Sequence, residues 1–142
     1  MTENYREQVY RLMLATNRCV SVYAKIAKEH GIKENTLLLM DILSDGKQHS
    51  QKQICKDWAI PKTTLNTIVG ECTKSGYLTL SVQDQSREKL IILTDEGKIF
   101  AERITKKMNQ AVEAAMTKTC KEFSSDFITV FEAYVDYLQK EI

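Results

Sequence analysis

The chain has 142 residues, a formal net charge of +1, 43% hydrophobic and 27% charged residues, and this composition is that of a globular domain rather than a disordered chain. With 1 Pro and 5 Gly there is little room for long loops, so we expect one helix-rich domain. No apolar run approaches the roughly 18 residues that cross a bilayer, and the start lacks a signal-peptide core. These features predict a cytoplasmic protein with no membrane partner.

The charges are unevenly distributed along the chain. Residues 47–90 contain seven basic and four acidic side chains, for a net charge of +3, whereas the rest of the chain has a net charge of −2. A mildly basic middle between acidic flanks suits contact with phosphates by one part of the protein.

Two helices are predicted before this basic segment. Apolar residues recur every three or four positions over residues 5–27, which predicts a long helix that stops near Gly31. The next helix begins at Asn35 or Thr36 and is apolar nearly all round, so we expect it to be central and buried.

Two short helices with a tight break follow. Ser50 and Gln53 have the spacing of a capping box at the start of the first, which extends to Trp58. Pro61 is suited to the first turn of the second. This second helix has its apolar positions at Leu65, Ile68, Val69 and Cys72.

The apolar period then changes from 3.6 to 2. Leu78, Leu80 and Val82 alternate with polar residues, which predicts a half-buried strand, and residues 89–93 form the returning strand of a hairpin. Thr94 begins a long helix with two acidic residues in its first turn, and a final helix carries Phe123, Phe127, Phe131 and Tyr134. The expected fold is mainly α with a small β-hairpin wing, in the order four helices, hairpin, two helices.

A helix pair followed by a hairpin is the pattern of a winged helix-turn-helix. Its second helix has to expose short polar side chains to enter a major groove, and Thr63, Thr64, Asn66 and Thr67 meet that need. Lysines at the two ends of that helix suit phosphates, and Arg87 at the hairpin tip suits a minor groove. These features predict binding to double-stranded DNA.

Several segments resemble the MarR family of winged helix-turn-helix regulators: ICKDWAIPKTTLNTIV (54–69), GYL (76–78), DQSREK (84–89) and LTDEG (93–97). The resemblance covers essentially the whole chain. It implies that Arg87 is the wing-tip arginine, that Asp84 orients it, and that residues 62–67 read bases; this wing has fewer arginines than most. The residues expected at the DNA are Ser50, Lys62, Thr63, Thr64, Asn66, Thr67, Lys74, Asp84, Arg87 and Lys89.

The resemblance also implies a homodimer on a pseudo-palindromic operator. One MarR-like domain then spans residues 1–142, with a DNA-binding lobe at 34–97 and a helical dimerisation region at 1–30 and 98–142. Such a protein is expected to be a repressor released by a small-molecule effector, with Tyr23, His30 and Met40 as candidate ligand-binding residues. No cofactor is expected.

Other interpretations stay open. Cys19 lies four residues before Tyr23, which resembles hydroperoxide-sensing relatives, although Lys33 and Thr36 stand where partner tyrosines are expected. The scattered cysteines are typical of small buried hydrophobes. A metal site would draw on Cys19, His30, His49, Cys55 and Cys72, but no pair has ligand spacing on one helical turn. No catalytic motif indicates an enzyme, and a winged helix used only for protein contact is a further alternative.

Overall fold

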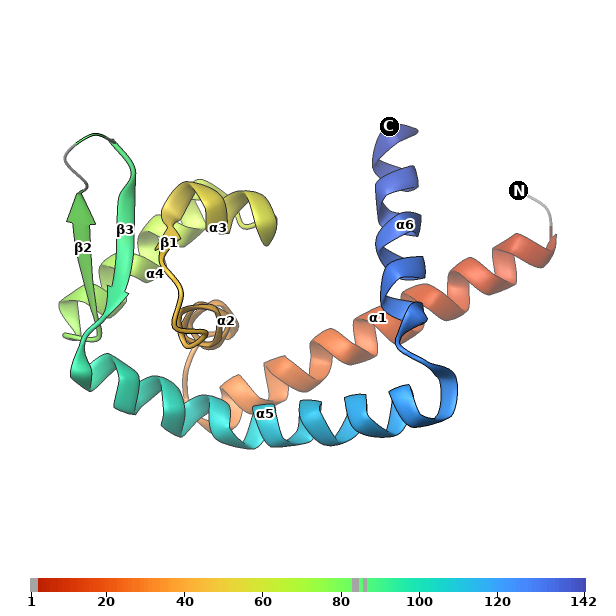
Figure 1. The fold of residues 1–142 in the computed structure, drawn as a ribbon, viewed down its shortest axis with the longest axis horizontal. Helices are drawn as coiled ribbons and strands as arrows, with labels where there is room; N and C mark the ends of the chain where they lie inside the picture. The colour runs from red at the N-terminus through yellow and green to blue at the C-terminus, as the bar shows by residue number, and fades with distance from the viewer. Residues whose placement is uncertain (1–2, 83–84, 86) are drawn as a thin grey trace. The chain divides into compact units, whose positions relative to one another are not determined.

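A computed structural model describes residues 3–82, 85 and 87–142 (Figure 1). The chain is mainly helical with a small antiparallel sheet, as predicted, and it divides into two compact units, residues 1–106 and 107–142. The elements are α1 (Glu3–Glu29), α2 (Glu34–Leu43), β1 (His49–Ser50), α3 (Gln51–Asp57), α4 (Lys62–Lys74), β2 (Leu78–Val82), β3 (Lys89–Leu93), α5 (Asp95–Phe123) and α6 (Asp126–Lys140).

The core of the first unit forms around α2, which is seen nearly end-on in Figure 1 between α3 and α4 on one side and the start of α5 on the other. Leu37, Leu39 and Met40 are at most 1% exposed, so the prediction of a central, buried helix is confirmed. The helix begins at Glu34, slightly before the predicted Asn35 or Thr36. Its start is formed by the backbone, because the Lys33 carbonyl accepts the first hydrogen bonds and no side chain caps it.

Half of the predicted capping box is present at the start of α3. The Ser50 hydroxyl accepts a hydrogen bond from the Gln53 amide nitrogen at 3.1 Å. The Gln53 side chain instead donates to Asp57 at 2.6 Å, so the reciprocal half of the prediction is wrong. After α3, Trp58 is 50% exposed and Ala59 adopts a φ of 50°, which makes the tight break before Pro61 and α4.

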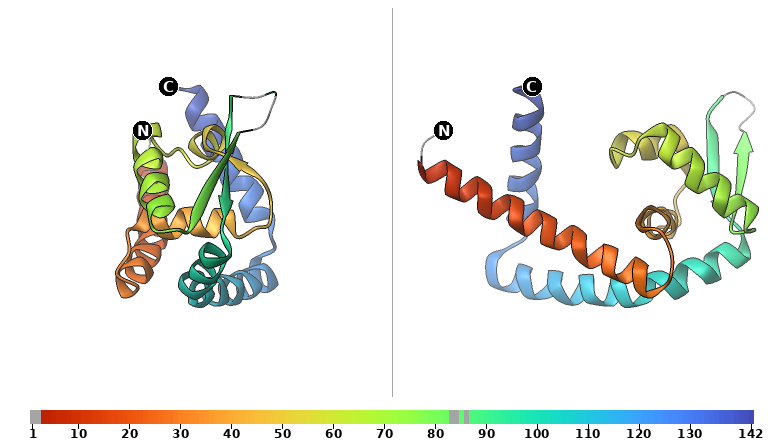
Figure 2. Two further views of the ribbon diagram at one scale, coloured as in Figure 1. Left: turned by 90° about the vertical axis from the view of Figure 1, so that its left-hand side faces the viewer. Right: turned by 180° about the vertical axis from the view of Figure 1, so that it is seen from behind.

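The sheet of the described residues has three strands in the order β1-β3-β2 rather than the predicted two. β1 pairs His49 with Ile91. In the hairpin, Leu78 faces Leu93 and Leu80 faces Ile91. Leu78 and Ile91 are buried, but Leu80 is 40% and Val82 63% exposed, so the predicted half-buried strand is correct only at its base. The outer half of the hairpin is the wing (Figure 2).

The base of the hairpin, opposite the wing, is fixed to the start of α5 by close contacts. The Thr94 hydroxyl donates to the Gly76 carbonyl at 2.6 Å and accepts from the Gly97 amide at 3.0 Å, which confirms the predicted cap. The Tyr77 ring stacks on Phe100 with 4.2 Å between centroids. A Cβ at Gly97 would lie 1.9 Å from the Tyr77 carbonyl oxygen, so this approach requires glycine.

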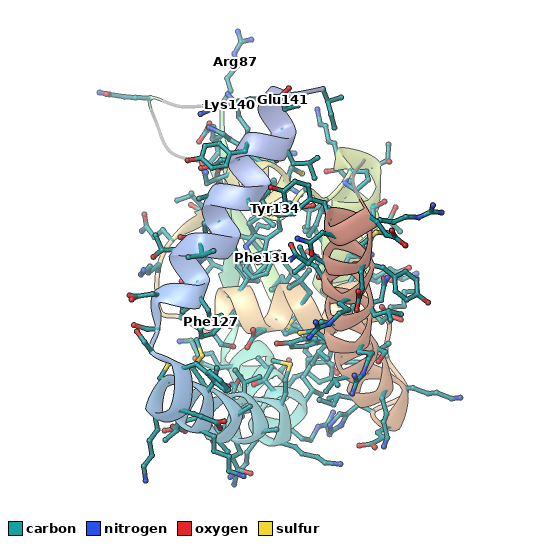
Figure 3. The ribbon with its side chains drawn as sticks, turned by 90° about the vertical axis from the view of Figure 1, so that its right-hand side faces the viewer. Arg87, Phe127, Phe131, Tyr134, Lys140 and Glu141 are labelled. Atoms are coloured by element: carbon teal, nitrogen blue, oxygen red, sulfur yellow. The ribbon has the colours of Figure 1, made fainter. Side chains whose placement is uncertain are left out.

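The second unit contains the end of α5 and α6. Phe123 is the last residue of α5, so its prediction within the final helix is wrong; Ser124, with a φ of 74°, breaks the chain there. Phe127, Phe131 and Tyr134 lie on one side of α6 (Figure 3), and no described residue of α6 is buried within the single chain. Of the helices that the structure describes, none is long and apolar enough to cross a membrane.

Candidate nucleic-acid interface

Helix α4 has two chemically different faces. Leu65, Ile68 and Val69 are at most 3% exposed and pack into the core of the first unit. The opposite face exposes Lys62, Thr63, Asn66 and Thr67, while Thr64 is half-buried at the boundary between the faces. Because the apolar face anchors the helix, the polar face is held outward in one fixed orientation.

A groove of about 650 Å³ lies between α3, α4 and the wing. Its described lining residues are Gln51, Lys52, Cys55, Lys62, Asn66, Arg87, Glu88 and Lys89. We call it the α3–wing groove. Among these lining residues are four cations and one carboxylate, so the α3–wing groove has the charge expected for contact with a polyanion.

Polar side chains in and beside the groove make hydrogen bonds. Gln51 Nε2 donates to Asn66 Oδ1 at 3.4 Å, so the Asn66 side chain lies beside the first turn of α3. An amide with both a donor and an acceptor can pair with the edge of adenine in a major groove. The Thr67 hydroxyl donates to the Thr63 carbonyl at 3.0 Å, which leaves its methyl group to contact a ligand.

The wing contributes the remaining cations. Arg87 is exposed and points outward from the wing (Figure 3). Lys52 of α3 lies 4.0 Å from the carboxylate of Glu88, so this ion pair links the helix pair to the wing. Asp84, expected to orient Arg87, lies outside the described residues.

Known proteins are similar to this chain in sequence and in fold. No family model matches the chain. It is 30% identical over 125 residues to the HTH-type transcriptional regulator PapX of Escherichia coli, which covers 80% of this chain and 76% of PapX. The fold is similar to the MarR family regulator NMB1585 of Neisseria meningitidis, with a TM-score of 0.81, 19% identity, and coverage of 94% of this chain and 95% of that one. It is also similar to a Staphylococcus aureus MarR in complex with salicylate and kanamycin, with a TM-score of 0.71, 18% identity, and coverage of 99% and 96%.

The chain belongs to the MarR family. It is therefore a winged helix-turn-helix, DNA-binding regulator of transcription. The residues that the sequence assigned to DNA binding can now be placed on this MarR fold.

Four of the residues expected at the DNA line the α3–wing groove: Lys62, Asn66, Arg87 and Lys89. Lys74 is the last residue of α4, about 18 Å along the helix axis from Lys62 at a rise of about 1.5 Å per residue. It therefore lies beyond the groove. Ser50 is 7% exposed and its hydroxyl caps α3, so its side chain positions that helix rather than facing outward.

Sequence reasoning missed Gln51, Lys52, Cys55 and Glu88 in the groove. The signal for the first two was present, because a capping box at Ser50 places Gln51 and Lys52 in the first turn of a helix next to the predicted reading helix. Glu88 was seen only as part of a polar hairpin tip. Its approach to α3 depends on the three-dimensional path of the wing.

The candidate regulatory residues do not share one environment. Met40 is 0% exposed and is a core residue of α2, whereas His30 is exposed just beyond α1. Burial raises the pKa of the Tyr23 phenol, and the nearby Cys19 and Asp41 raise it further. Tyr23 and Cys19 are therefore close together on α1; Cys19 is exposed, and Tyr23 is 37% exposed and so partly buried.

The cysteines differ in exposure. Cys72 is buried, and burial followed by the charge of Glu71 raises the pKa of its thiol, which keeps it protonated. Cys55 and Cys120 are half-buried, and Cys19 is exposed, so the expectation of a buried hydrophobe is confirmed for Cys72 and wrong for Cys19. Within the described ranges, no three His, Cys, Asp or Glu side chains gather in a group suited to a metal ion.

Proposed function

We propose that this protein is a homodimeric repressor that binds a pseudo-palindromic operator and is released from it by a small-molecule effector. The observation that carries the proposal is the α3–wing groove, in which cations of α3, α4 and the wing flank the exposed polar face of α4. In this proposal α4 enters the major groove of a half-site and the wing reaches the adjacent minor groove.

Roles within the site follow from chemistry. Asn66, hydrogen-bonded to Gln51, contacts a base edge together with Thr63 and Thr67. Lys62, Lys52 and Lys89 contact phosphates, and Lys74 contacts the backbone at the far end of α4. Arg87 enters the minor groove. Thr64 is half-buried at the edge of the polar face and helps to position α4 rather than contacting a base. Asp84 orients Arg87 in this proposal.

Dimerisation is supported by exposed apolar side chains on the terminal helices. Tyr5, Tyr10 and Met13 of α1 are each more than half exposed, and the aromatic side of α6 is open to solvent in the single chain. Exposed apolar side chains gathered on a helix are typical of association with another protein surface. We assign residues 34–97 to the DNA-binding lobe and residues 1–30 and 98–142 to the dimerisation region.

Two observations support the proposal that an effector releases the repressor: one comes from a solved MarR structure and the other from α1. A solved MarR structure with a similar fold contains salicylate, a small aromatic acid. In this chain Tyr23 offers an aromatic ring beside α2, in the region where the long first helix meets the DNA-binding lobe. An effector there acts by favouring a spacing of the two α4 helices that does not fit DNA.

The test is selection of bound duplexes from random DNA, followed by titration at several salt concentrations. A recovered palindrome, with half-site centres about 34–36 Å apart, supports the proposal. The logarithm of the association constant should fall linearly with the logarithm of the salt concentration, and a clearly negative slope supports phosphate contact. A purified protein that retains no duplex at 50 mM salt would overturn the proposal and would favour a winged helix that contacts only proteins.

Thiol sensing is a second candidate because Cys19 is exposed and lies near the Tyr23 phenol. In that case treatment with an organic hydroperoxide lowers operator affinity of the unmodified protein, while a Cys19→Ser variant keeps its affinity. Equal affinity before and after treatment of the unmodified protein would remove this candidate.

A further inference from the structure

The α3–wing groove holds one charge that opposes DNA. Of its described lining residues, Glu88 is the one with a carboxylate, and it stands among Lys52, Lys62, Arg87 and Lys89. We propose that Glu88 is a built-in competitor for the DNA backbone: it occupies Lys52 in the free protein, and a phosphate has to displace it. This proposal rests on the proposed function, because it concerns the same surface.

Geometry places the two charges on different elements. Lys52 lies in the first turn of α3, and Glu88 immediately precedes β3. Their Nζ and Oε1 atoms are 4.0 Å apart, across the groove rather than along one helix. The carboxylate therefore lies within ion-pair distance of Lys52, on the wing side of the groove, and competes with a phosphate for the same cation.

The stability of the fold does not explain this ion pair. The Lys52 side chain is 84% exposed and that of Glu88 is 48% exposed. Exposed ion pairs contribute little to folding because water and salt screen them and because two long side chains must be ordered. The consequence of the pair lies in what it does to the groove.

A carboxylate resembles a phosphate in the two properties that Lys52 recognises: it is anionic and it presents oxygen acceptors. When a duplex binds, Lys52 must exchange one anion for the other, and Glu88 must then face a phosphate of like charge. Both effects lower affinity for every duplex, whatever its sequence, because phosphates carry no sequence information. Glu88 thus weakens binding without changing which bases are read.

The experiment compares Glu88→Gln with the unmodified protein on the selected operator and on an unrelated duplex. Removal of one opposing charge at a separation of several ångströms is expected to raise affinity for both duplexes by roughly three- to tenfold at low salt. The slope of log affinity against log salt should steepen by up to about one, because Lys52 is now available to a phosphate. The two proteins should converge at high salt, where exposed charges are screened.

A matched control is Glu34→Gln, which makes the same change of net charge at the exposed start of α2, outside the residues that line the groove and outside the residues assigned to dimerisation. Its affinity should stay within about twofold of the unmodified protein, since distant exposed charges are screened. A double-mutant cycle adds Lys52→Gln. Loss of Lys52 should lower affinity more in the Glu88→Gln background than in the unmodified protein, because Glu88 no longer offsets Lys52.

Three outcomes overturn the proposal. If Glu88→Gln lowered the affinity for duplex, Glu88 would be a residue that positions the cations. If the affinity for duplex did not change, Glu88 would have no effect on DNA binding. An equal gain in Glu34→Gln would mean that net charge alone is responsible. In each of these cases the unmodified protein still binds duplex, which distinguishes the failure of this inference from the failure of the proposed function.

Discussion

At the scale of single residues, Asn66 is the side chain that we propose to contact a base edge. It is exposed on α4, and its Oδ1 accepts a long hydrogen bond of 3.4 Å from Gln51 Nε2. Asn66→Ala is expected to cost about 1–3 kcal/mol of binding free energy at one base position of the operator. Fluorescence anisotropy with operators substituted at each position measures this. An equal loss on every sequence would show instead that Asn66 contacts a phosphate.

Asp41, which is half-buried on α2, provides a test of pH dependence in the first unit. Burial raises the pKa of its carboxyl, so the folded state resists ionisation of this group. Below the unfolded pKa of about 3.9 the carboxyl is protonated in both states and does not lower the free energy of unfolding. As pH rises through the folded pKa, the partly buried carboxyl has to ionise, and this lowers the free energy of unfolding. Asp41→Asn should therefore raise the melting temperature at pH 7 and leave it unchanged near pH 3.5. A gain of equal size at both pH values would contradict the burial of the charge as its cause.

The residues that sequence analysis could assign were those whose role is local. Lys62 and Asn66 belong to one amphipathic helix, so the side on which they lie follows from the helical period. Lys52, Glu88 and Gln51 belong to different elements, and their meeting in one groove depends on the fold as a whole. The sequence therefore predicted the polar face of α4 but not the opposite wall of the groove.

At the scale of elements, the contact between the base of the hairpin and α5 depends on Gly97. Its approach to the Tyr77 carbonyl leaves no space for a Cβ atom. Gly97→Ala should therefore destabilise the fold by about 1–3 kcal/mol through overpacking, and urea unfolding monitored by circular dichroism measures it.

Gly70→Ala is the matched control for Gly97→Ala. Gly70 lies on the exposed face of α4 and a Cβ there would contact nothing within 4 Å. Because alanine is the better helix former, this variant should gain up to about 1 kcal/mol. Loss of stability in both variants would show that the close approach at Gly97 is not the cause.

Helices with a clear apolar period were predicted well, and the sheet less well. β1 has two residues, and it is a strand only because His49 and Ser50 pair with β3, far along the chain. Alternation in β2 was real, but Leu80 and Val82 lie beyond the part of the hairpin that the core covers. A period of two indicates which side chains share a face, and it does not indicate how far along the strand that face is covered.

At the scale of the whole molecule, the apolar side of α6 predicts an oligomer that one charge can disrupt. Phe131 is 42% exposed and lies in the middle of the aromatic row. Phe131→Glu should weaken dimerisation by about 2 kcal/mol or more, which is roughly 30-fold, because a central aromatic anchor is replaced by a charge that would have to be desolvated. Sedimentation equilibrium measures the dissociation constant.

Thr129→Glu places the same charge on the other side of α6 and serves as the control. It should leave dimerisation unchanged. If both variants remained dimeric, a different surface would hold the two copies together, and the assignment of residues 98–142 to dimerisation would be wrong.

The exposed Trp58 also has a practical consequence. It is the single tryptophan of the chain, and it lies in the turn between α3 and α4, half open to water. Intrinsic emission excited at the indole band therefore originates from one known place beside the reading helix. Quenching or a blue shift on adding duplex would report events at that turn in real time, without any attached dye.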